Sequence, residues 1–310
     1  MKIQITEPQD YSKKALDAYR SLGKVVFGHK PQHDTDILVI GLNYRIDKKW
    51  FDAMPKLKLI AWQGTGLNHI DIKAMKERGI KLISLRGRKG FLKNIPSTAE
   101  EAMALLLALV RNIPWSFDAA KGGSWNRMPW RGRQLYQKTI GLVGFGRLGR
   151  IMSRYAKAFG MHVIAYDPYV SSGLMKNAGV AKVSLVKLLK ESDVISLHAL
   201  LTDENYGMIN ERHLRAMKPS AVLINTARGE LIAKGAIERA LSKKWIAGAA
   251  LDVIWDERSD GSHLKNNPLM EYAKKNKNLI IVPHIGGATF EAMAVTQDYV
   301  AELVKKYLRK

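Results

Sequence analysis

The 310-residue chain contains no cysteine, which excludes a disulfide framework and thiolate chemistry. It also lacks any apolar run of the roughly 20 residues that a membrane-spanning helix needs. The first residues, MKIQITEP, have no apolar core of the kind that signal peptides carry. These absences argue against secreted disulfide-rich proteins and integral membrane proteins, and we expect a cytoplasmic protein with no membrane partner.

Acidic residues are also scarce, with 28 Asp and Glu against 50 Lys and Arg and a net charge of +22. Such a balance favours anionic partners. The cations are dispersed in pairs such as Lys13-Lys14 and Lys243-Lys244, and no block of five or more occurs. This dispersion favours a solvated basic surface over a dedicated nucleic-acid site.

Short apolar strands alternate with amphipathic helical stretches throughout the chain, which predicts an α/β fold with parallel strands. Ser97–Glu100 has the pattern of a capping box, and the very apolar helix AEEAMALLLALVRNI, which starts at Ala99, should run to Ile113 and stop at Pro114. We place a domain boundary here. The expected strands are Lys2–Ile5, Lys24–Val26, Ile37–Ile40, Leu57–Trp62, Lys81–Ser84, Thr139–Val143, His162–Tyr166, Val194–Leu197, Ala221–Asn225, Gly248–Val253 and Leu279–Val282.

The motif TIGLVGFGRLGR places Gly144, Gly146 and Gly149 after an apolar strand and at the start of a helix. In such a GxGxxG loop the glycines allow a tight turn, close approach of a pyrophosphate and close packing of helix on strand. The next strand, HVIAY, leads into Asp167, where an acid accepts hydrogen bonds from the adenosine ribose and repels a 2′-phosphate. The pattern predicts a Rossmann-type domain that binds NAD rather than NADP.

Arg228 follows the apolar strand AVLI in the segment NTARGELI. The carboxyl ends of parallel strands form the ligand edge of such a sheet. A guanidinium there can clamp a carboxylate in two-pronged geometry. Taken alone, this arginine is better interpreted as part of a surface salt bridge.

His284 lies in VPHIGGAT, again directly after a strand, and is followed by Gly286 and Gly287, which allow a backbone to approach a ligand closely. The strand end ALDVIWDERSD, Ala250 to Asp260, carries Asp252, Asp256, Glu257 and Asp260. A carboxylate beside a histidine orients it for general acid–base catalysis. A purely structural histidine remains the alternative.

These motifs, in this order and over nearly the whole chain, resemble the D-isomer-specific 2-hydroxyacid dehydrogenase family, and the chain is most similar to its phosphoglycerate dehydrogenase branch. The resemblance implies a Rossmann-type doubly wound parallel sheet, residues 97–285, inserted into a smaller flavodoxin-like α/β substrate domain, residues 1–96 and 286–310. It implies reversible, NAD-dependent oxidation of a D-2-hydroxy acid by a homodimer, in which the helix from Ala99 is one candidate contact.

By the same resemblance, Arg228 binds the substrate carboxylate, His284 is the acid–base catalyst, and Glu257, preferred over Asp256 on spacing, is its partner. The amides of Thr65 and Gly66, in GTGLNHID, are expected to bind the substrate carboxylate. The residues expected to bind the cofactor are Gly144, Gly146, Arg147, Leu148, Gly149, Asp167, Thr226, Ala227, Asp252, Gly286 and Gly287.

Two departures from the family pattern concern loop shape. His198-Ala199-Leu200-Leu201-Thr202 lacks the proline that the family often has in its His-x-Pro-x-Thr loop, and Glu257 is followed by Arg258 rather than proline. No metal site is expected, because Pro31 separates His29 from His33 and no third ligand is evident.

The substrate is left open by the sequence. The segment RGRKGFLK, Arg86 to Lys93, holds four cations in eight residues and is either a solvated loop or a second anion site. The phosphoglycerate dehydrogenase resemblance makes 3-phosphoglycerate the first candidate, with glyoxylate or hydroxypyruvate reduction close behind. A different class of function, an NAD(H)-sensing corepressor-like binding protein, is the remaining alternative.

Overall fold

The computed structural model describes residues 1–9, 11–42, 44–258 and 260–309. The chain forms two compact units: Met1–Ile95 with Arg258–Ser262 and Ala288–Lys310, and Pro96–Glu257 with His263–Gly287. Relative to the expected boundaries, Pro96, Gly286 and Gly287 fall in the second unit, and the short segment Arg258–Ser262 falls in the first.

The first unit is built on a five-stranded parallel sheet in the order β2-β1-β3-β4-β5. This is the strand order of flavodoxin-like folds, as the resemblance implied. Its strands are β1 (Lys2–Ile5), β2 (Lys24–Phe27), β3 (Ile37–Ile40), β4 (Leu59–Trp62) and β5 (Lys81–Ser84), and its helices are α1 (Lys13–Arg20), α2 (Lys48–Ala53), α3 (Ile72–Glu77), α4 (Lys89–Leu92) and α13 (Phe290–Leu308).

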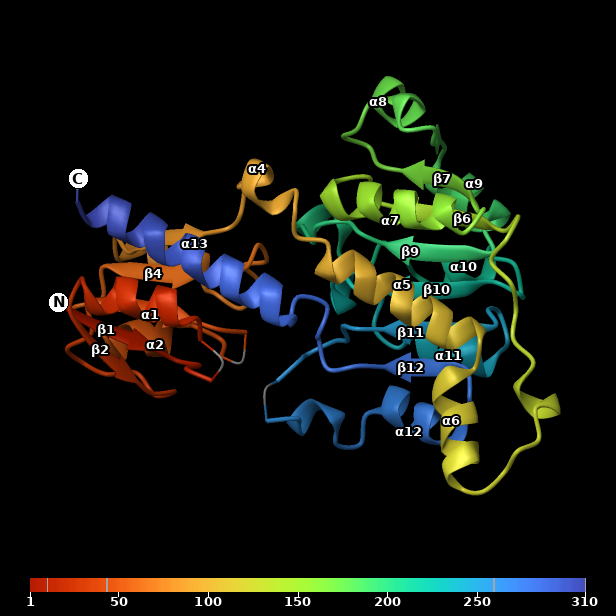
Figure 1. Ribbon diagram of the computed structural model, residues 1–310, viewed down its shortest axis with the longest axis horizontal. Helices are drawn as coiled ribbons and strands as arrows, with labels where there is room; N and C mark the ends of the chain where they lie inside the picture. The colour runs from red at the N-terminus through yellow and green to blue at the C-terminus, as the bar shows by residue number, and fades with distance from the viewer. Residues whose placement is uncertain (10, 43, 259, 310) are drawn as a thin grey trace. The chain divides into compact units, whose positions relative to one another are not determined.

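Helices cover both faces of this sheet, so that its central strands are buried on both sides. Ile37 and Val39 of β3 pack in one cluster with residues of α1 and α13, and Figure 1 shows these two helices side by side. Leu38 and Ile40 point the other way and pack with residues of α2 and α3. Successive side chains of an apolar strand point to opposite faces of the sheet, so one strand contributes to the core on both sides.

The second unit is built on a seven-stranded parallel sheet in the order β12-β11-β10-β9-β6-β7-β8. The strands are β6 (Thr139–Val143), β7 (His162–Tyr166), β8 (Ala181–Lys182), β9 (Val194–Leu197), β10 (Val222–Asn225), β11 (Gly248–Leu251) and β12 (Leu279–Ile281). The α-helices are α5 (Ser97–Val110), α6 (Ile113–Lys121), α7 (Arg147–Ala158), α8 (Ser172–Asn177), α9 (Leu185–Glu191), α10 (Glu211–Arg215), α11 (Ala236–Ser242) and α12 (Pro268–Lys275). Short 3₁₀ turns span Met128–Trp130, Asp203–Asn205, Gly229–Leu231 and Ser262–Leu264.

The chain reverses its winding direction in this sheet between β6 and β9, which are neighbours although β7 and β8 lie between them in the sequence. Helices α5 and α7 pack together on one face of the sheet (Figure 1). Helices α9, α10 and α11 contribute to the core on the other face. In such a doubly wound sheet the crevice at the carboxyl ends of the strands, at the reversal, is the usual ligand site.

Helix α5 differs from its prediction at both ends. It begins at Ser97 with Pro96 as N-cap, and the amides of Ala99 and Glu100 both donate to the Pro96 carbonyl, so the predicted capping box is wrong. The helix ends at Val110, and Pro114 lies in the first turn of α6, where a proline sacrifices no hydrogen bond.

None of the helices in the described part of the chain is both long and apolar enough to cross a bilayer.

Candidate active site

The glycine loop between β6 and α7 is shaped by contacts that only glycine permits. Gly144 has a φ of 96°, and a Cβ on it would lie 2.7 Å from backbone atoms of His198 and Ala199. A Cβ on Gly149 would lie 2.2 Å from the Gly144 carbonyl oxygen. Around Gly146, by contrast, no atom lies within 4 Å of such a Cβ. Two glycines therefore close the turn, and the third leaves its outer side open to a pyrophosphate.

Helix α7 begins directly after this loop, with Gly146 as an N-cap that makes no side-chain capping bond. The first helical residues are Arg147 and Leu148, both predicted to contact the cofactor. Burial lowers the pKa of the Arg147 guanidinium. The amides of a helix's first turn and its positive end together favour a bound phosphate.

Asp167 lies at the carboxyl end of β7, where the motif requires an acid, and is buried. Its Oδ2 accepts from the amide of Phe145 at 2.8 Å, and its Oδ1 accepts from the amide of Tyr169 at 2.9 Å. The carboxylate thus fixes the glycine loop from the side. Each oxygen has a second lone pair, which can accept from a ribose hydroxyl.

Arg228 lies on the loop after β10, and the last residue of that strand, Asn225, fixes the loop backbone. The Asn225 side chain accepts from the amide of Ala227 at 3.0 Å and donates to the Arg228 carbonyl at 2.8 Å. The Arg228 guanidinium donates to the Ala227 carbonyl at 2.6 Å. Desolvation lowers the pKa of Arg228, and this effect outweighs the charges of Glu257, Glu230 and Asp252, which raise it. A half-buried cation at the carboxyl edge of the sheet suits a bound carboxylate.

His284 and Glu257 form a hydrogen-bonded pair, with His284 Nδ1 at 2.6 Å from Glu257 Oε2. The other carboxylate oxygen of Glu257 accepts from the amide of Ile254 at 2.9 Å. Burial alone would raise the pKa of Glu257, but the hydrogen bond and charge of His284, the Ile254 amide and the charge of Arg228 lower it overall. Glu257 is therefore held ionised on one nitrogen of the imidazole.

Asp256, the competitor for the role of Glu257, points elsewhere. Its carboxylate pairs with Lys234 Nζ at 2.6 Å, and both side chains are exposed. Its backbone has a φ of 58°, which turns the chain between the two acids. The structure thus brings Glu257, and not Asp256, to His284.

Asp252 lies directly after β11 and is 1% exposed. Burial raises its pKa, and this effect outweighs the amide hydrogen bonds of Gly286 and Ile285 and the charge of His284. On α5, burial and then the charge of Asp252 raise the pKa of Glu101. Gly286, which was predicted to contact the cofactor, lies against Asp252 and Thr98: a Cβ on it would be 2.8 Å from Asp252 Oδ2. Its neighbour Gly287 is open.

Thr65 and Gly66 belong to the first unit, on the loop after β4. The Trp62 indole N–H donates to the Gly66 carbonyl at 2.8 Å, which fixes the loop over the end of its own strand. The amide of Leu85, at the end of β5, donates to the Gly64 carbonyl at 3.1 Å. The loop with Thr65 therefore lies beside the start of the basic segment Arg86–Lys93, whose four cations are exposed.

Two features of the site were missed by reasoning from the sequence. Gly229 is one: a Cβ on it would lie 2.3 Å from the carbonyl carbon and oxygen of Ile254, so the Arg228 loop and the Glu257 loop touch through it. His198 is the other. Its Nε2 lies 2.9 Å from Ser196 Oγ, its buried Nδ1 makes no hydrogen bond within the described residues, and burial lowers its pKa to about 4. The predicted cofactor contact Thr226 likewise has a buried hydroxyl without a hydrogen-bond partner there. The sequence had marked His198 only as the first residue of a loop that lacks an expected proline.

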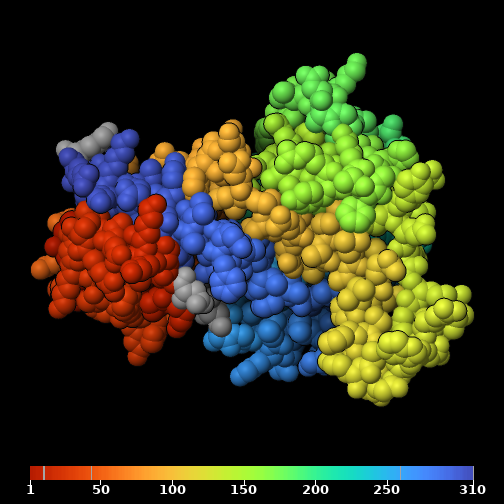
Figure 2. Space-filling view, viewed as in Figure 1, coloured from red at the N-terminus to blue at the C-terminus, as the bar shows by residue number. Residues whose placement is uncertain are grey.

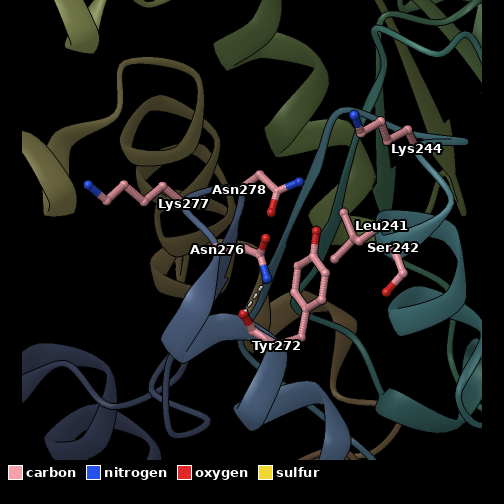
Figure 3. Close-up of a pocket in the computed structure, with 7 residues that line it drawn as sticks. All are labelled: Leu241, Ser242, Lys244, Tyr272, Asn276, Lys277 and Asn278. Atoms are coloured by element: carbon pink, nitrogen blue, oxygen red, sulfur yellow. Dashed lines mark hydrogen bonds between the residues drawn. The ribbon is translucent and has the colours of Figure 1, made fainter.

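A separate surface hollow lies at the amino end of β12 and contains none of the predicted site residues. Figure 3 shows the Tyr272 ring beside the two asparagines, with Asn276 Nδ2 donating to the Tyr272 carbonyl at 2.9 Å. The hollow is lined by Leu241, Ser242, Lys244, Tyr272, Asn276, Lys277 and Asn278. Within the described ranges, no three His, Asp or Glu side chains are grouped so as to hold a metal ion.

Comparison with known proteins identifies the family. Residues 103–286 match the model of the family described as D-isomer specific 2-hydroxyacid dehydrogenase, NAD binding domain. The glyoxylate reductase of Thermococcus litoralis is 39% identical over 282 residues, which cover 89% of this chain and 80% of that protein. The D-3-phosphoglycerate dehydrogenase of Methanocaldococcus jannaschii is 37% identical over 277 residues, 89% of this chain but 50% of that protein, so the chain spans half the length of this relative.

Among solved structures, the D-lactate dehydrogenase of Aquifex aeolicus, complexed with NAD and lactic acid, aligns with a TM-score of 0.86 and 29% identity over 100% of this chain and 96% of that one. The family model and this solved structure both name NAD, which makes NAD the cofactor class. The chain therefore belongs to the D-isomer specific 2-hydroxyacid dehydrogenases, a family of NAD-dependent oxidoreductases.

Proposed function

We propose that the chain catalyses reversible hydride transfer between a D-2-hydroxy acid and NAD⁺, with His284 as the acid–base catalyst. The observation that carries the proposal is the 2.6 Å contact between His284 Nδ1 and Glu257, on the same sheet edge as Arg228 and the glycine loop. In this proposal the second unit binds NAD. The first unit binds the substrate, and its Thr65 and Gly66 amides bind a carboxylate.

The geometry supports a different role for each of the two imidazole nitrogens of His284. An ionised Glu257 accepts the proton of Nδ1, so Nε2 carries a lone pair in the neutral ring. In the oxidation, Nε2 takes the hydroxyl proton of the substrate, and Glu257 stabilises the imidazolium that forms. NAD⁺ supplies the hydride acceptor. Arg228 binds the carboxylate and holds the reacting carbon at a fixed distance.

Replacing His284 with alanine tests this role. Positioned acid–base groups contribute roughly 10²- to 10⁴-fold to rate, so His284→Ala should lose at least 100-fold in turnover. NADH affinity, measured by fluorescence titration, should stay within threefold of wild type. Near-normal turnover of the variant would show that another group moves the proton.

A phosphorylated substrate, 3-phosphoglycerate, is the first candidate within this function. The Leu85–Gly64 hydrogen bond sets the basic segment, with exposed Arg86, Arg88 and Lys89, beside the loop proposed to bind the carboxylate. A phosphate and a carboxylate of one small acid can therefore both find cationic or amide partners in the first unit. The relative from M. jannaschii is named D-3-phosphoglycerate dehydrogenase.

Glyoxylate is the second candidate, favoured by a different observation. The relatives from Thermococcus litoralis and Korarchaeum cryptofilum, 39% and 38% identical to the chain, are both named glyoxylate reductase. A substrate without a distal anion would leave Arg86, Arg88 and Lys89 as solvated surface.

NADH oxidation with 3-phosphohydroxypyruvate, hydroxypyruvate, glyoxylate, pyruvate and 2-oxoglutarate separates these candidates. Preference for the phosphorylated acid, lost in an Arg86→Ala/Arg88→Ala/Lys89→Ala variant, would support the phosphate subsite. Preference for glyoxylate, unchanged in that variant, would support the second candidate. Tight NADH binding without turnover of any acid would instead favour the NAD(H)-sensing binding protein.

A homodimer is part of this proposal, with α6 and the following segment as its contact. Helix α5, the contact expected from the sequence, packs within its own unit against α7 and the sheet. Apolar residues beyond it are exposed instead, among them Phe117 at 61% and Trp125 at 94%. In Figure 2 this segment, in yellow, lies at the surface. Light scattering should give a dimer mass, and a Phe117→Lys/Trp125→Lys variant should give a monomer.

A further inference from the structure

Asp252 makes three hydrogen bonds to three consecutive residues, and the first of these is His284. Its main-chain carbonyl accepts from the amide of His284 at 2.9 Å. Its carboxylate accepts from the amide of Ile285 at 2.6 Å through Oδ1 and from the amide of Gly286 at 3.0 Å through Oδ2. Both ends of the carboxylate are thus engaged by backbone in a site that excludes water.

His284 has a backbone conformation that needs such support. Its φ is 55°, in the left-handed region, which costs an L-residue about 1–2 kcal/mol relative to the usual conformations. The side chain of His284 bonds to Glu257, and the exposed Pro283 and Ile285 beside it contribute little packing. The turn itself is held by the backbone hydrogen bonds to Asp252 and by a 3.0 Å bond from the His284 amide to the Val282 carbonyl.

The turn also has no room to shift towards Asp252. A Cβ on Gly286 would lie 2.8 Å from Asp252 Oδ2 and 3.2 Å from Thr98 Cγ2, so the backbone is already in close contact with the carboxylate. The direction of the His284 side chain, and with it the 2.6 Å contact to Glu257, follows from where this backbone is fixed.

We propose that Asp252 is the positioning residue of His284: its carboxylate fixes the 284–286 turn so that the imidazole meets Glu257. This inference rests on the proposed function, in which His284 is the catalyst. It differs from the role that the family resemblance implied for Asp252, a contact of the cofactor. A cofactor contact predicts weaker NADH affinity when Asp252 is replaced, whereas a positioning residue predicts unchanged affinity.

Asp252→Asn keeps the shape of the side chain but replaces one acceptor oxygen with an N–H₂ donor, which faces an amide donor. One of the two amide bonds is lost, and the turn is freed at that point. Removing a group that orients a functional residue through hydrogen bonds typically lowers activity 10- to 100-fold. We therefore expect kcat to fall 10- to 100-fold while the Kd of NADH stays within threefold. The matched control is Asp256→Asn, in an exposed pair with Lys234, which should leave both values unchanged.

The deciding readout is the pair of ring ¹⁵N chemical shifts of His284, assigned by their absence in His284→Ala. In the wild type they should report the tautomer protonated at Nδ1, and in Asp252→Asn they should move towards a mixture of tautomers as the Glu257 contact loosens. A purely structural role would lower thermal stability without moving them. If Asp252→Asn fails to fold, Asp252→Ser, whose hydroxyl accepts from one amide, gives the same comparison.

Unchanged ¹⁵N shifts would overturn the proposal, as would a tenfold weaker NADH affinity with unchanged kcat, which would make Asp252 a cofactor ligand. Because the shifts do not depend on turnover, a wild type that reduces no 2-oxo acid would refute the proposed function while still deciding the role of Asp252.

Discussion

Gly229→Ala is the perturbation whose effect can be worked most fully from the structure. The added Cβ would lie 2.3 Å from the carbonyl carbon and oxygen of Ile254 and 2.8 Å from its Cα. Ordinary contacts of this kind begin near 3.4 Å. Because all three atoms belong to the backbone, the loop with Arg228 and the loop leading to Glu257 must separate by about 1 Å to admit the methyl group.

A displacement of about 1 Å at a catalytic site can cost on the order of 100-fold in rate, which corresponds to about 2.7 kcal/mol in the barrier. We therefore expect kcat/KM for the 2-oxo acid to fall about 100-fold in Gly229→Ala. Overpacking should also lower the free energy of unfolding by about 1–3 kcal/mol, and the Kd of NADH should change little.

Steady-state NADH oxidation, NADH fluorescence titration and urea unfolding measure these three quantities. Gly173→Ala in α8 is the matched control, because nothing lies within 4 Å of its added Cβ; it should behave as wild type. If Gly229→Ala kept kcat/KM within threefold of wild type, the two loops would not need this spacing, and the account of how Arg228 and Glu257 are brought together would fail.

Two further predictions concern the charged groups of the site. Arg228→Lys keeps the charge but loses the two-pronged geometry, so kcat/KM for the 2-oxo acid should fall 10- to 100-fold with NADH affinity retained; equal loss of both would place Arg228 at the cofactor instead. The pKa of Glu257 is lowered in the folded chain from its ordinary value of 4.5, so its stabilising contribution is complete above that value and is lost as pH falls through the folded pKa. Urea unfolding between about pH 3 and 6 should therefore show a steeper loss of stability on acidification in wild type than in Glu257→Gln, and parallel curves would contradict the ionised pair.

The sequence predicted the site to the extent that strand order determines it. Arg228, Asp252 and His284 each follow a strand within three residues, and β10, β11 and β12 are neighbours in one parallel sheet. Their carboxyl ends lie at one edge whatever the loops do, so apolar strand patterns and the residues behind them were enough to bring the three together.

Loop conformation was beyond that reasoning, because it depends on contacts between distant segments. Asp256 and His284 both have positive φ, a conformation uncommon for residues other than glycine, and the sequence does not mark where it occurs. The close approach of Gly229 to Ile254 likewise needs both loops to be folded before it can be seen. A glycine in NTARG gives no hint of its partner.

The predicted capping box at Ser97 was wrong because another acceptor, the Pro96 carbonyl, binds the first amides of the helix. The Ser-x-x-Glu pattern was present, but the Pro96 carbonyl accepts from the amides of Ala99 and Glu100 and so starts the helix one residue earlier. Pattern alone does not tell which of two competing acceptors the first amides choose.

The central claim, that the chain transfers a hydride to the C2 carbon of a 2-oxo acid with D stereochemistry, is tested most directly with NADH carrying deuterium at its transferable position. Glyoxylate is left out because its product, glycolate, has no D or L form. The preferred acid among the rest of the panel is reduced by the wild-type protein, and the product is analysed by mass and by chiral separation. One deuterium is expected on C2 of a product that is wholly of the D configuration. A product without deuterium on C2, or one of L or mixed configuration, would contradict it.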